Sequence, residues 1–185
     1  MKTLFVMRHA KAERDSDTGR DFDRPLAKRG WHDAEAVGRE MRVRGLEPDA
    51  VLASPARRAA ETVRAFASGY GTLEPEFEAG IYDAPADRLI EIVRNAADGA
   101  ERLLIVGHNP GFQELVLRLA GGDRGEHSDH IVDGFPTAAI AAVELPAGRW
   151  REIAERSGRI VDLILPRDLK NYRPGRSNRA RAERK

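Results

Sequence analysis

The stretch Leu4-Phe5-Val6-Met7-Arg8-His9-Ala10-Lys11-Ala12 decides how the rest of this sequence is interpreted. Its four successive apolar residues, Leu4 to Met7, are typical of a buried strand in a parallel sheet. The run ends abruptly in Arg8 and His9, and open α/β sheets hold their ligands just beyond the carboxyl ends of their strands. Both side chains are therefore candidates for a functional site, although an Arg-His pair at one strand end, taken alone, is more often ordinary surface sequence.

The composition describes one globular domain. At 185 residues the chain is long enough for a single domain with a substantial core. No apolar run approaches the length of a membrane span or of a signal-peptide core, so we expect a cytoplasmic protein with no membrane partner. The absence of cysteine excludes disulfides, a thiolate nucleophile and Cys-ligated metal sites.

Charge is distributed unevenly along the chain. Residues 170–185 carry a net charge of +6 and, because the whole chain carries +1, the remainder carries −5. We expect residues 1–169 to form the domain and residues 170–185 to form a flexible basic tail. Such arms can bind nucleic acid, but we interpret this one as a solvated extension and expect no nucleic-acid partner.

Hydrophobic periodicity predicts alternating strands and helices. Residues 13–24 carry no apolar period and are expected to form a loop. Residues 25–45 have apolar residues at helical spacing and residues 50–53 are a second short apolar run, which predicts a βαβ unit with a right-handed crossover. A further helix is predicted within residues 81–99, and residues 102–107 are the clearest buried strand.

The segment after the second strand has an unusual charge for a helix start. Ser54 is expected to be the N-cap and Pro55 the first helical residue. The helix dipole disfavours cations in the first turn, where Arg57 and Arg58 lie. Arg57 can pair with Glu61 one turn later, whereas Arg58 has no acidic residue at helical spacing. A bound anion would supply its partner; the alternative is an arginine exposed to solvent.

His108 repeats this arrangement directly after the strand at residues 102–107. Asn109 is expected to cap the following helix, with Pro110 at its first position. For a second time, a basic residue lies between the end of a predicted strand and the start of the next predicted helix.

The last third of the chain changes character. Residues 121–134 are polar and glycine-bearing and are expected to form a loop, and the Glu126–His130 segment lacks a recognised metal-ligand spacing. Residues 137–145, 149–154 and 159–165 are predicted as three strands of a hairpin or meander at one side of the sheet.

Three predicted strands therefore end in residues with related chemistry. The carboxyl ends of parallel strands face the same way, so Arg8, His9, Arg58 and His108 are expected to converge on one crevice. Arginine pairs bidentately with phosphate oxygens, and a neutral imidazole is a competent nucleophile toward phosphorus. The sequence has no P-loop, no Gly-x-Gly-x-x-Gly motif and no acidic cluster at a strand end. This combination favours a phosphatase that needs neither metal nor cofactor.

With these motifs in view, the sequence resembles the histidine phosphatase superfamily, which is related to the phosphoglycerate mutases. Within it, the sequence is similar to the short, SixA-type branch of phosphohistidine phosphatases. The motifs follow the family's order over nearly all of residues 1–169. They are Met7-Arg8-His9-Ala10-Lys11-Ala12, Asp23-Arg24-Pro25-Leu26 with Gly30, Ser54-Pro55-x-x-Arg58-Ala59-x-x-Thr62, Val106-Gly107-His108-Asn109-Pro110-Gly111, and Phe135-Pro136-Thr137-Ala138 with Trp150.

This resemblance implies a three-layer α/β/α fold with a mostly parallel central sheet. It also implies that His9 attacks phosphorus and forms a phosphohistidine, which water then hydrolyses. Arg8, Arg58 and His108 would hold the phosphoryl oxygens and stabilise the transition state. Arg24 resembles a further arginine of the phosphate pocket.

The sequence departs from the family pattern in two places. Ala10 replaces the glycine of the usual Arg-His-Gly (RHG) motif, so this turn is expected to keep φ below zero. The connection that supplies a general acid in many relatives is short here, which leaves Asp83 as the candidate. An imidazole leaving group needs less protonation than an alkoxide, and a short connection makes a thin lid that suits a protein substrate.

The favoured hypothesis is a monomeric phosphatase acting on phosphohistidine in signalling or phosphocarrier proteins. Hydrolysis of small phosphate esters is the first alternative. A second alternative is a non-catalytic module that binds a phosphorylated partner, although binding alone would not need a nucleophile at His9. A mutase is disfavoured because it must shield its phosphoenzyme from water, which a thin lid does poorly.

Overall fold

The structure is a computed structural model that describes residues 1–169 with the exception of Arg124. The predicted basic tail at residues 170–185 lies outside the described residues. None of the helices in this part of the chain is long and apolar enough to cross a membrane.

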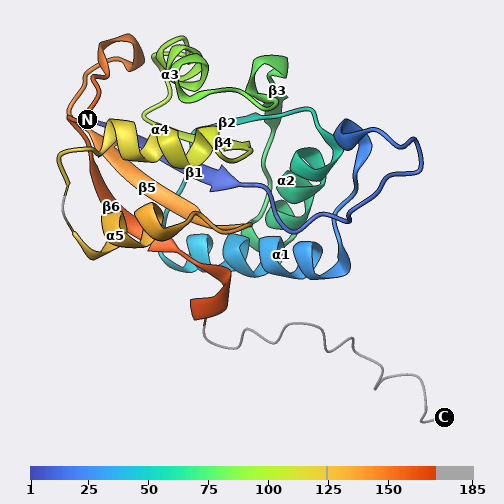
Figure 1. Ribbon diagram of the computed structural model, residues 1–185. Helices are drawn as coiled ribbons and strands as arrows, with labels where there is room; N and C mark the ends of the chain where they lie inside the picture. Colours follow the sequence, from blue (N-terminus) through green and yellow to red (C-terminus); the bar gives the residue numbers. More distant parts are fainter. Residues whose placement is uncertain (124, 170–185) are drawn as a thin grey trace.

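In the described residues one sheet of six strands forms the centre of the molecule, in the order β3-β2-β4-β1-β5-β6 (Figure 1). The pairs β1–β4, β4–β2 and β2–β3 are parallel, and β5 and β6 are added antiparallel at the other edge. The prediction of a mostly parallel sheet is thus confirmed. The strands are β1 (Lys2–Arg8), β2 (Ala50–Ala53), β3 (Pro75–Phe77), β4 (Arg102–Gly107), β5 (Ile140–Leu145) and β6 (Arg159–Ile164).

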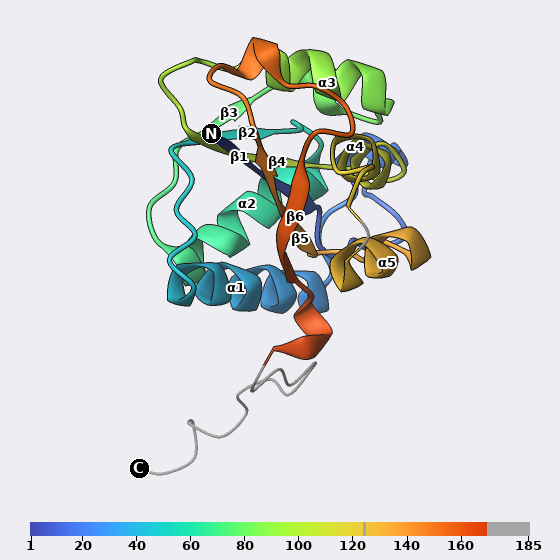
Figure 2. The ribbon, with the colours of Figure 1, turned by 90° about the vertical axis from the view of Figure 1, so that its left-hand side faces the viewer.

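Helices cover both faces of the sheet and make three layers, as predicted (Figure 2). Successive side chains of β1 point to opposite faces, so Leu4 and Val6 join one buried cluster while Phe5 and Met7 join the other. Residues of α1 (Lys28–Val43) and α2 (Arg57–Tyr70) complete the cluster around Phe5. Residues of α3 (Ala86–Arg94), α4 (Gly111–Leu119) and α5 (Glu126–Asp133) complete the cluster around Leu4.

Helices α1 and α2 approach each other closely because glycine faces backbone at their contact. A Cβ atom at Gly38 would collide with the carbonyl oxygen of Phe66 in α2, and one at Gly69 would collide with that of Glu35 in α1. Only residues without a side chain allow this approach of the two helices.

The two predicted helix starts are wrong by a few residues. Helix α2 begins at Arg57 with Ala56 as its N-cap, and α4 begins at Gly111 with Pro110 as its N-cap. Neither Ser54 nor Asn109 is the N-cap residue. The hydroxyl of Ser54 does accept a hydrogen bond from the amide of Ala56 at 3.3 Å, but the shorter hydrogen bond of each side chain goes to a distant group. Ser54 pairs with His108, and Asn109 donates to the carbonyl of Phe135.

Several predictions for irregular and edge segments are also wrong. Residues 121–134 contain helix α5, whose Ile131 is fully buried. The predicted strand at 149–154 is instead a 3₁₀ turn, Trp150–Glu152, because Trp150 turns inward and its Nε1 donates to the carbonyl of Ala100 at 2.7 Å. The edge strand β3 was not predicted. Residues 13–24 do form a loop, as predicted, with a 3₁₀ turn at Asp21–Asp23.

Candidate active site

Backbone hydrogen bonds to β4 and to the residues just before β5 hold the end of β1. The amide of His9 donates to the carbonyl of Gly107 at the end of β4, across 2.8 Å. On the other side, the amide of Arg8 donates to the carbonyl of Ala139 at 3.1 Å, and the amide of Ala138 donates back to the carbonyl of Arg8. Ala10 is absent from the residues with positive φ, as the sequence predicted. The two basic residues therefore leave the sheet in a fixed direction.

The four residues that the sequence singled out lie together at this edge of the sheet. The ring centroids of His9 and His108 are 5.2 Å apart. Arg58 and His108 are almost completely buried. The positive charges of Arg58 and Arg8 act on both histidines, where they lower each pKa. Two guanidinium groups and two imidazoles thus share one site, in which Arg58 and His108 are buried while Arg8 and His9 are partly exposed.

His9 is held as a neutral imidazole with a defined tautomer. Burial, together with the charges of Arg58, Arg8 and Arg24, lowers its pKa to about 4, against the opposing effect of a hydrogen bond to Ala10. The Nδ1 atom lies 2.7 Å from the carbonyl oxygen of Ala10. Because a carbonyl only accepts, Nδ1 carries the proton, which leaves the unshared electron pair on Nε2.

His108 is also neutral at physiological pH. Burial, together with the smaller effects of His9 and Arg58, lowers its pKa to about 3. Its Nε2 lies 2.8 Å from the hydroxyl of Ser54. Within the described structure, His108 Nδ1 and Arg8 Nε are buried without a hydrogen-bond partner. Such atoms are costly to leave unpaired, and a bound oxyanion would satisfy them.

The partner of Arg58 in this structure is a carboxylate from the loop before α1. Its Nη1 donates to the backbone carbonyl of Asp21 at 2.8 Å, and its Nη2 lies 2.9 Å from the Asp21 carboxylate. The structure therefore rules out the alternative of an arginine exposed to solvent, since Arg58 is 4% exposed, and gives Arg58 an acidic partner that the sequence analysis did not foresee. Sequence spacing missed the contact because Asp21 lies 37 positions away.

An uncharacterised protein of Mycobacterium tuberculosis is 34% identical to this chain over 164 residues, which cover 87% of this chain and all of that protein. The sequence pattern of the histidine phosphatase superfamily (branch 1) matches residues 4–84, which include Arg8, His9 and Arg58. The chain belongs to the histidine phosphatase superfamily. It is a phosphatase by that membership.

Solved structures agree with this membership at the level of the fold. A Nakamurella multipartitia protein assigned as phosphohistidine phosphatase SixA superposes with a TM-score of 0.76 at 24% identity, over 89% of this chain and 96% of that one. The protein histidine phosphatase SixA complexed with tungstate gives a TM-score of 0.72 at 23% identity, over 91% of this chain and 99% of that one. This histidine phosphatase therefore has the SixA fold.

Arg24 and Asp83, the two further candidates of this histidine phosphatase, both lie beside Asp21 or Arg58. Arg24 Nη1 is 2.7 Å from Oδ1 of Asp21, and Arg24 Nε donates to the carbonyl of Glu13. Asp83 Oδ1 is 4.0 Å from Nη2 of Arg58, and 58% of its side chain is exposed. Arg24 holds the pKa of Asp21 at about 2, with Tyr82 and Arg58 contributing, so Asp21 is ionised.

Tyr82 was missed by the sequence analysis. Its hydroxyl donates to Oδ2 of Asp21 at 3.0 Å, and its ring meets His108 edge-on with centroids 5.5 Å apart. In the sequence, Tyr82 stands in a turn before a helix, where nothing distinguishes it from a surface residue. Only the contact between distant segments gives it a place in the site of this phosphatase.

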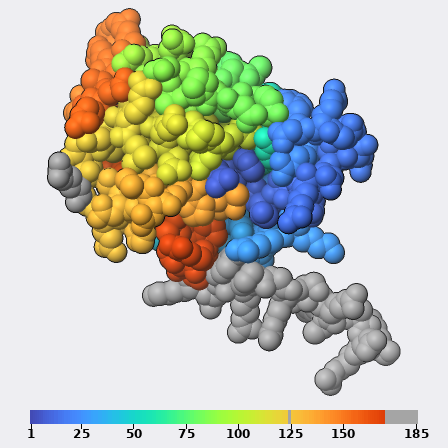
Figure 3. Space-filling view, in the orientation of Figure 1, coloured from blue at the N-terminus to red at the C-terminus, as the bar shows by residue number. Residues whose placement is uncertain are grey.

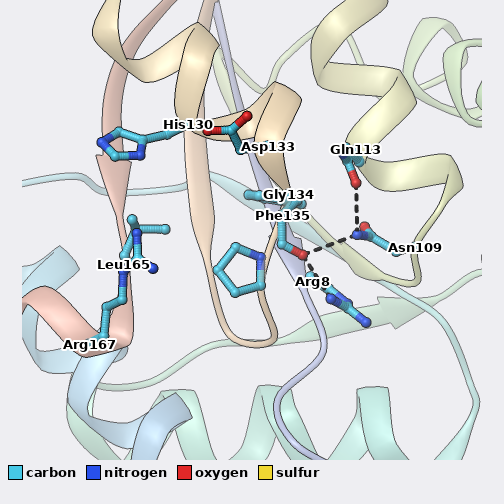
Figure 4. Close-up of a pocket in the computed structure, with 10 residues that line it drawn as sticks. Arg8, Asn109, Gln113, His130, Asp133, Gly134, Phe135, Leu165 and Arg167 are labelled. Atoms are coloured by element: carbon cyan, nitrogen blue, oxygen red, sulfur yellow. Dashed lines mark hydrogen bonds between the residues drawn. The ribbon is translucent and has the colours of Figure 1, made fainter.

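A cavity of about 540 Å³ adjoins Arg8 on the side of α4 and α5 (Figure 4). At its base Arg8 Nη1 and Asn109 Nδ2 both donate to the carbonyl of Phe135, at 2.8 and 3.1 Å. His130 and Arg167 line it opposite Gln113. In the described part of the chain, no three His, Asp or Glu side chains are grouped as potential metal ligands.

Proposed function

We propose that this chain is a metal-independent phosphohistidine phosphatase that works through a phosphohistidine intermediate on His9. The observation that carries the proposal is the state of His9. It is neutral, its Nδ1 is fixed by Ala10, its ring lies 5.2 Å from that of His108, and the charges of Arg58 and Arg8 act on it. This arrangement supplies a nucleophile and the positive charge that a phosphoryl group requires.

In the first step His9 Nε2 attacks phosphorus. A bond forms between this nitrogen and phosphorus while the bond to the leaving group breaks, and the electron pair of that bond departs with the leaving group. Arg8 and Arg58 hold the equatorial oxygens and offset their charge. An N–H of His108 donates to the same oxygens, and Arg24 adds positive charge from beyond Asp21.

In the second step water attacks the phosphoryl group on His9. The bond from phosphorus to Nε2 breaks, its electron pair returns to the imidazole, and inorganic phosphate forms as the water gives up a proton to solvent. Nδ1 keeps its proton throughout and donates it in a hydrogen bond to the carbonyl of Ala10, so His9 regains its starting state. Keeping the tautomer fixed leaves Nε2 ready for the next turnover.

A protein substrate is supported by the space around the site. The cavity beside Arg8 offers room for the residues that flank a phosphorylated side chain, which a small phosphate ester does not need. The SixA protein that shares this fold is named a protein histidine phosphatase. A cytoplasmic location, a monomeric state and a role in signal transduction stay predictions from the sequence.

The test is hydrolysis of a histidine-phosphorylated protein by the purified full chain in excess EDTA. We expect full activity with EDTA and a loss of at least ~10³-fold in kcat on His9→Ala, because the nucleophile is removed. His127→Ala in α5 is the matched control and should keep its activity. The proposal is wrong if activity survives His9→Ala or depends on added metal. Faster hydrolysis of small phosphate esters than of the phosphoprotein would favour the first alternative.

A further inference from the structure

Two aromatic rings border the phosphoryl site at the contact between the β1–α1 loop and the turn before α3. The ring of Phe22 meets the ring of Tyr82 edge-on, with centroids 5.1 Å apart. Phe22 is 36% exposed, although it is a large hydrophobic residue. In Figure 3 the blue N-terminal segment lies against the green residues around α3, on the right-hand side of the molecule. The pair is therefore a surface feature at the mouth of the site.

Tyr82 contacts the groups that we assign to the phosphoryl oxygens. Its ring meets His108 edge-on, and Cζ of Arg58 lies 5.8 Å from its centroid. The ring of His9 also contacts His108, and the structure shows no ring contact between His9 and Tyr82 in the described residues. In an in-line displacement the leaving group stands on the side of phosphorus away from the nucleophile. Tyr82 is thus placed to meet the leaving group rather than the attacking nitrogen.

Two carboxylates accompany these rings, and their hydrogen bonds differ. Both oxygens of Asp21 are already used, by Arg24, Arg58 and Tyr82. Asp83 follows Tyr82 directly, and its ion pair within the described residues is the 4.0 Å contact with Arg58. Its φ of +47° lies in the left-handed region, which costs a non-glycine residue about 1 kcal/mol or more. Asp83 is the carboxylate with oxygens left for a ligand.

We propose that Phe22, Tyr82 and Asp83 form a leaving-group subsite that selects a cationic ring, the imidazolium of phosphohistidine, over the neutral alkyl group of a phosphate ester. The inference rests on the proposed function. Aromatic faces attract a planar cation, and a carboxylate accepts its N–H as a charge-assisted hydrogen bond. The unpartnered, buried Nδ1 of His108 marks the adjoining position of the phosphoryl group.

The subsite gives Asp83 a different task from that of a general acid. The ring nitrogen of the substrate that is not bonded to phosphorus carries a proton, and Asp83 accepts its hydrogen bond. When His9 Nε2 bonds to phosphorus, the P–N bond of the substrate breaks and its electron pair returns to the ring. The ring leaves as neutral imidazole with its own proton, so no acid is required.

Because the ring loses its charge during this step, Asp83 binds the ground state more strongly than the transition state. Removing its charge is therefore expected to raise KM for the phosphohistidine substrate and not to lower kcat, because the barrier measured from the bound ground state does not increase. If Asp83 acted as a general acid, its substitution would instead lower kcat and leave KM almost unchanged.

The experiment compares one peptide carrying phosphohistidine with the same peptide carrying phosphoserine, using the full chain with Asp83→Asn or Phe22→Leu. We expect each variant to raise KM for the phosphohistidine peptide about tenfold more than for the phosphoserine peptide. The Asp83→Asn effect should fade as rising pH removes the proton from the substrate ring. Asp87→Asn, at an exposed carboxylate of α3, is the matched control.

Equal changes in KM for the two peptides, or no change, would overturn the subsite. A fall in kcat alone on Asp83→Asn would overturn it in favour of a general acid. Failure of the wild-type chain to hydrolyse the phosphohistidine peptide would reject the proposed function and the subsite with it. If the wild-type chain hydrolyses the phosphohistidine peptide and the variants keep its preference over the phosphoserine peptide, the subsite is rejected and the proposed function stands.

Discussion

The backbone amide of Ala10 donates a hydrogen bond to the hydroxyl of Thr62 across 2.9 Å, although the two residues are 52 positions apart in the sequence. The same hydroxyl donates to the carbonyl of Arg58 one turn earlier in α2, at 2.6 Å. Thr62 is fully buried. One side chain therefore ties the turn that carries His9 to the helix turn that carries Arg58.

Replacing Thr62 by valine keeps the shape of the side chain and removes this link. The buried amide of Ala10 would lose its partner, so we expect the free energy of unfolding to fall by about 1–3 kcal/mol. We also expect kcat/KM to fall, because the two turns are no longer held in register. Urea unfolding and steady-state kinetics measure the two effects. Thr62→Ser retains the hydroxyl and should stay near wild type; equal stability of Thr62→Val and wild type would contradict the prediction.

The lowered pKa of His9 sets the acid limit of activity. A free histidine becomes protonated below about pH 6.5, whereas His9 has a pKa of about 4. We therefore expect kcat/KM to stay high between pH 7 and 5 and to fall only near pH 4, as Nε2 gains a proton. A pH profile on a substrate whose own ionisation is known measures this limit. An acid limb centred near pH 6.5 would show that His9 is not held as described.

Stability should respond to pH over a different range. The unfolded chain binds a proton at each histidine near pH 6.5, whereas folded His9 and His108 resist protonation down to about 4 and 3. The unfolded state therefore binds more protons in this window, and the free energy of unfolding falls as pH drops through it. Urea unfolding from pH 7 to 4 tests the sign. The doubly substituted chain, with His9→Gln and His108→Gln, should show a shallower decline.

Ser54 is expected to act through His108. Its hydroxyl lies 2.8 Å from Nε2 of that histidine, and both side chains are buried. We expect Ser54→Ala to lower kcat about tenfold, because His108 loses the contact that orients its ring. Ser68→Ala is the matched control, since the Ser68 hydroxyl donates within α2 to the carbonyl of Ala65. If Ser54→Ala keeps full activity, Ser54 does not orient His108 and only fills space in the core.

Gly38→Ala should loosen α1 from α2. Its Cβ would meet the carbonyl of Phe66, which cannot move without displacing the α2 backbone. We expect a loss of about 1–3 kcal/mol in the free energy of unfolding, typical of overpacking. Gly99→Ala serves as the control, because a Cβ at Gly99 meets nothing within 4 Å. Equal thermal unfolding of the two variants would contradict the expected clash.

The strands at the centre of the sheet were predictable because their sequence signal is local. A strand buried on both faces must be apolar throughout, and β1 and β4 have runs of that kind. The rule that parallel strands end at the same edge then predicted that Arg8, His9 and His108 would meet. The short edge strand β3 has no such signal, since most of it is exposed.

Side chains with a choice of partner could not be assigned from the sequence. Ser54 and Asn109 stand where helix caps are common, yet each bonds to a distant group that local sequence does not reveal. Trp150 lies in a segment with strand-like composition, but burial of its ring turns the backbone into a 3₁₀ turn. In each case a tertiary contact outweighs a weak local preference.

The sequence by itself determined the α/β class and the identity of the residues at three strand ends, beginning with the run from Leu4 to His9. Periodicity and strand-end chemistry are properties of neighbouring residues, so a single chain displays them. Only the tertiary structure decided that Asp21 and Tyr82 meet at Arg58, that His9 keeps its proton on Nδ1, and that Ser54 faces His108. These features depend on distances and burial between segments far apart in the chain, and those quantities exist only once it has folded.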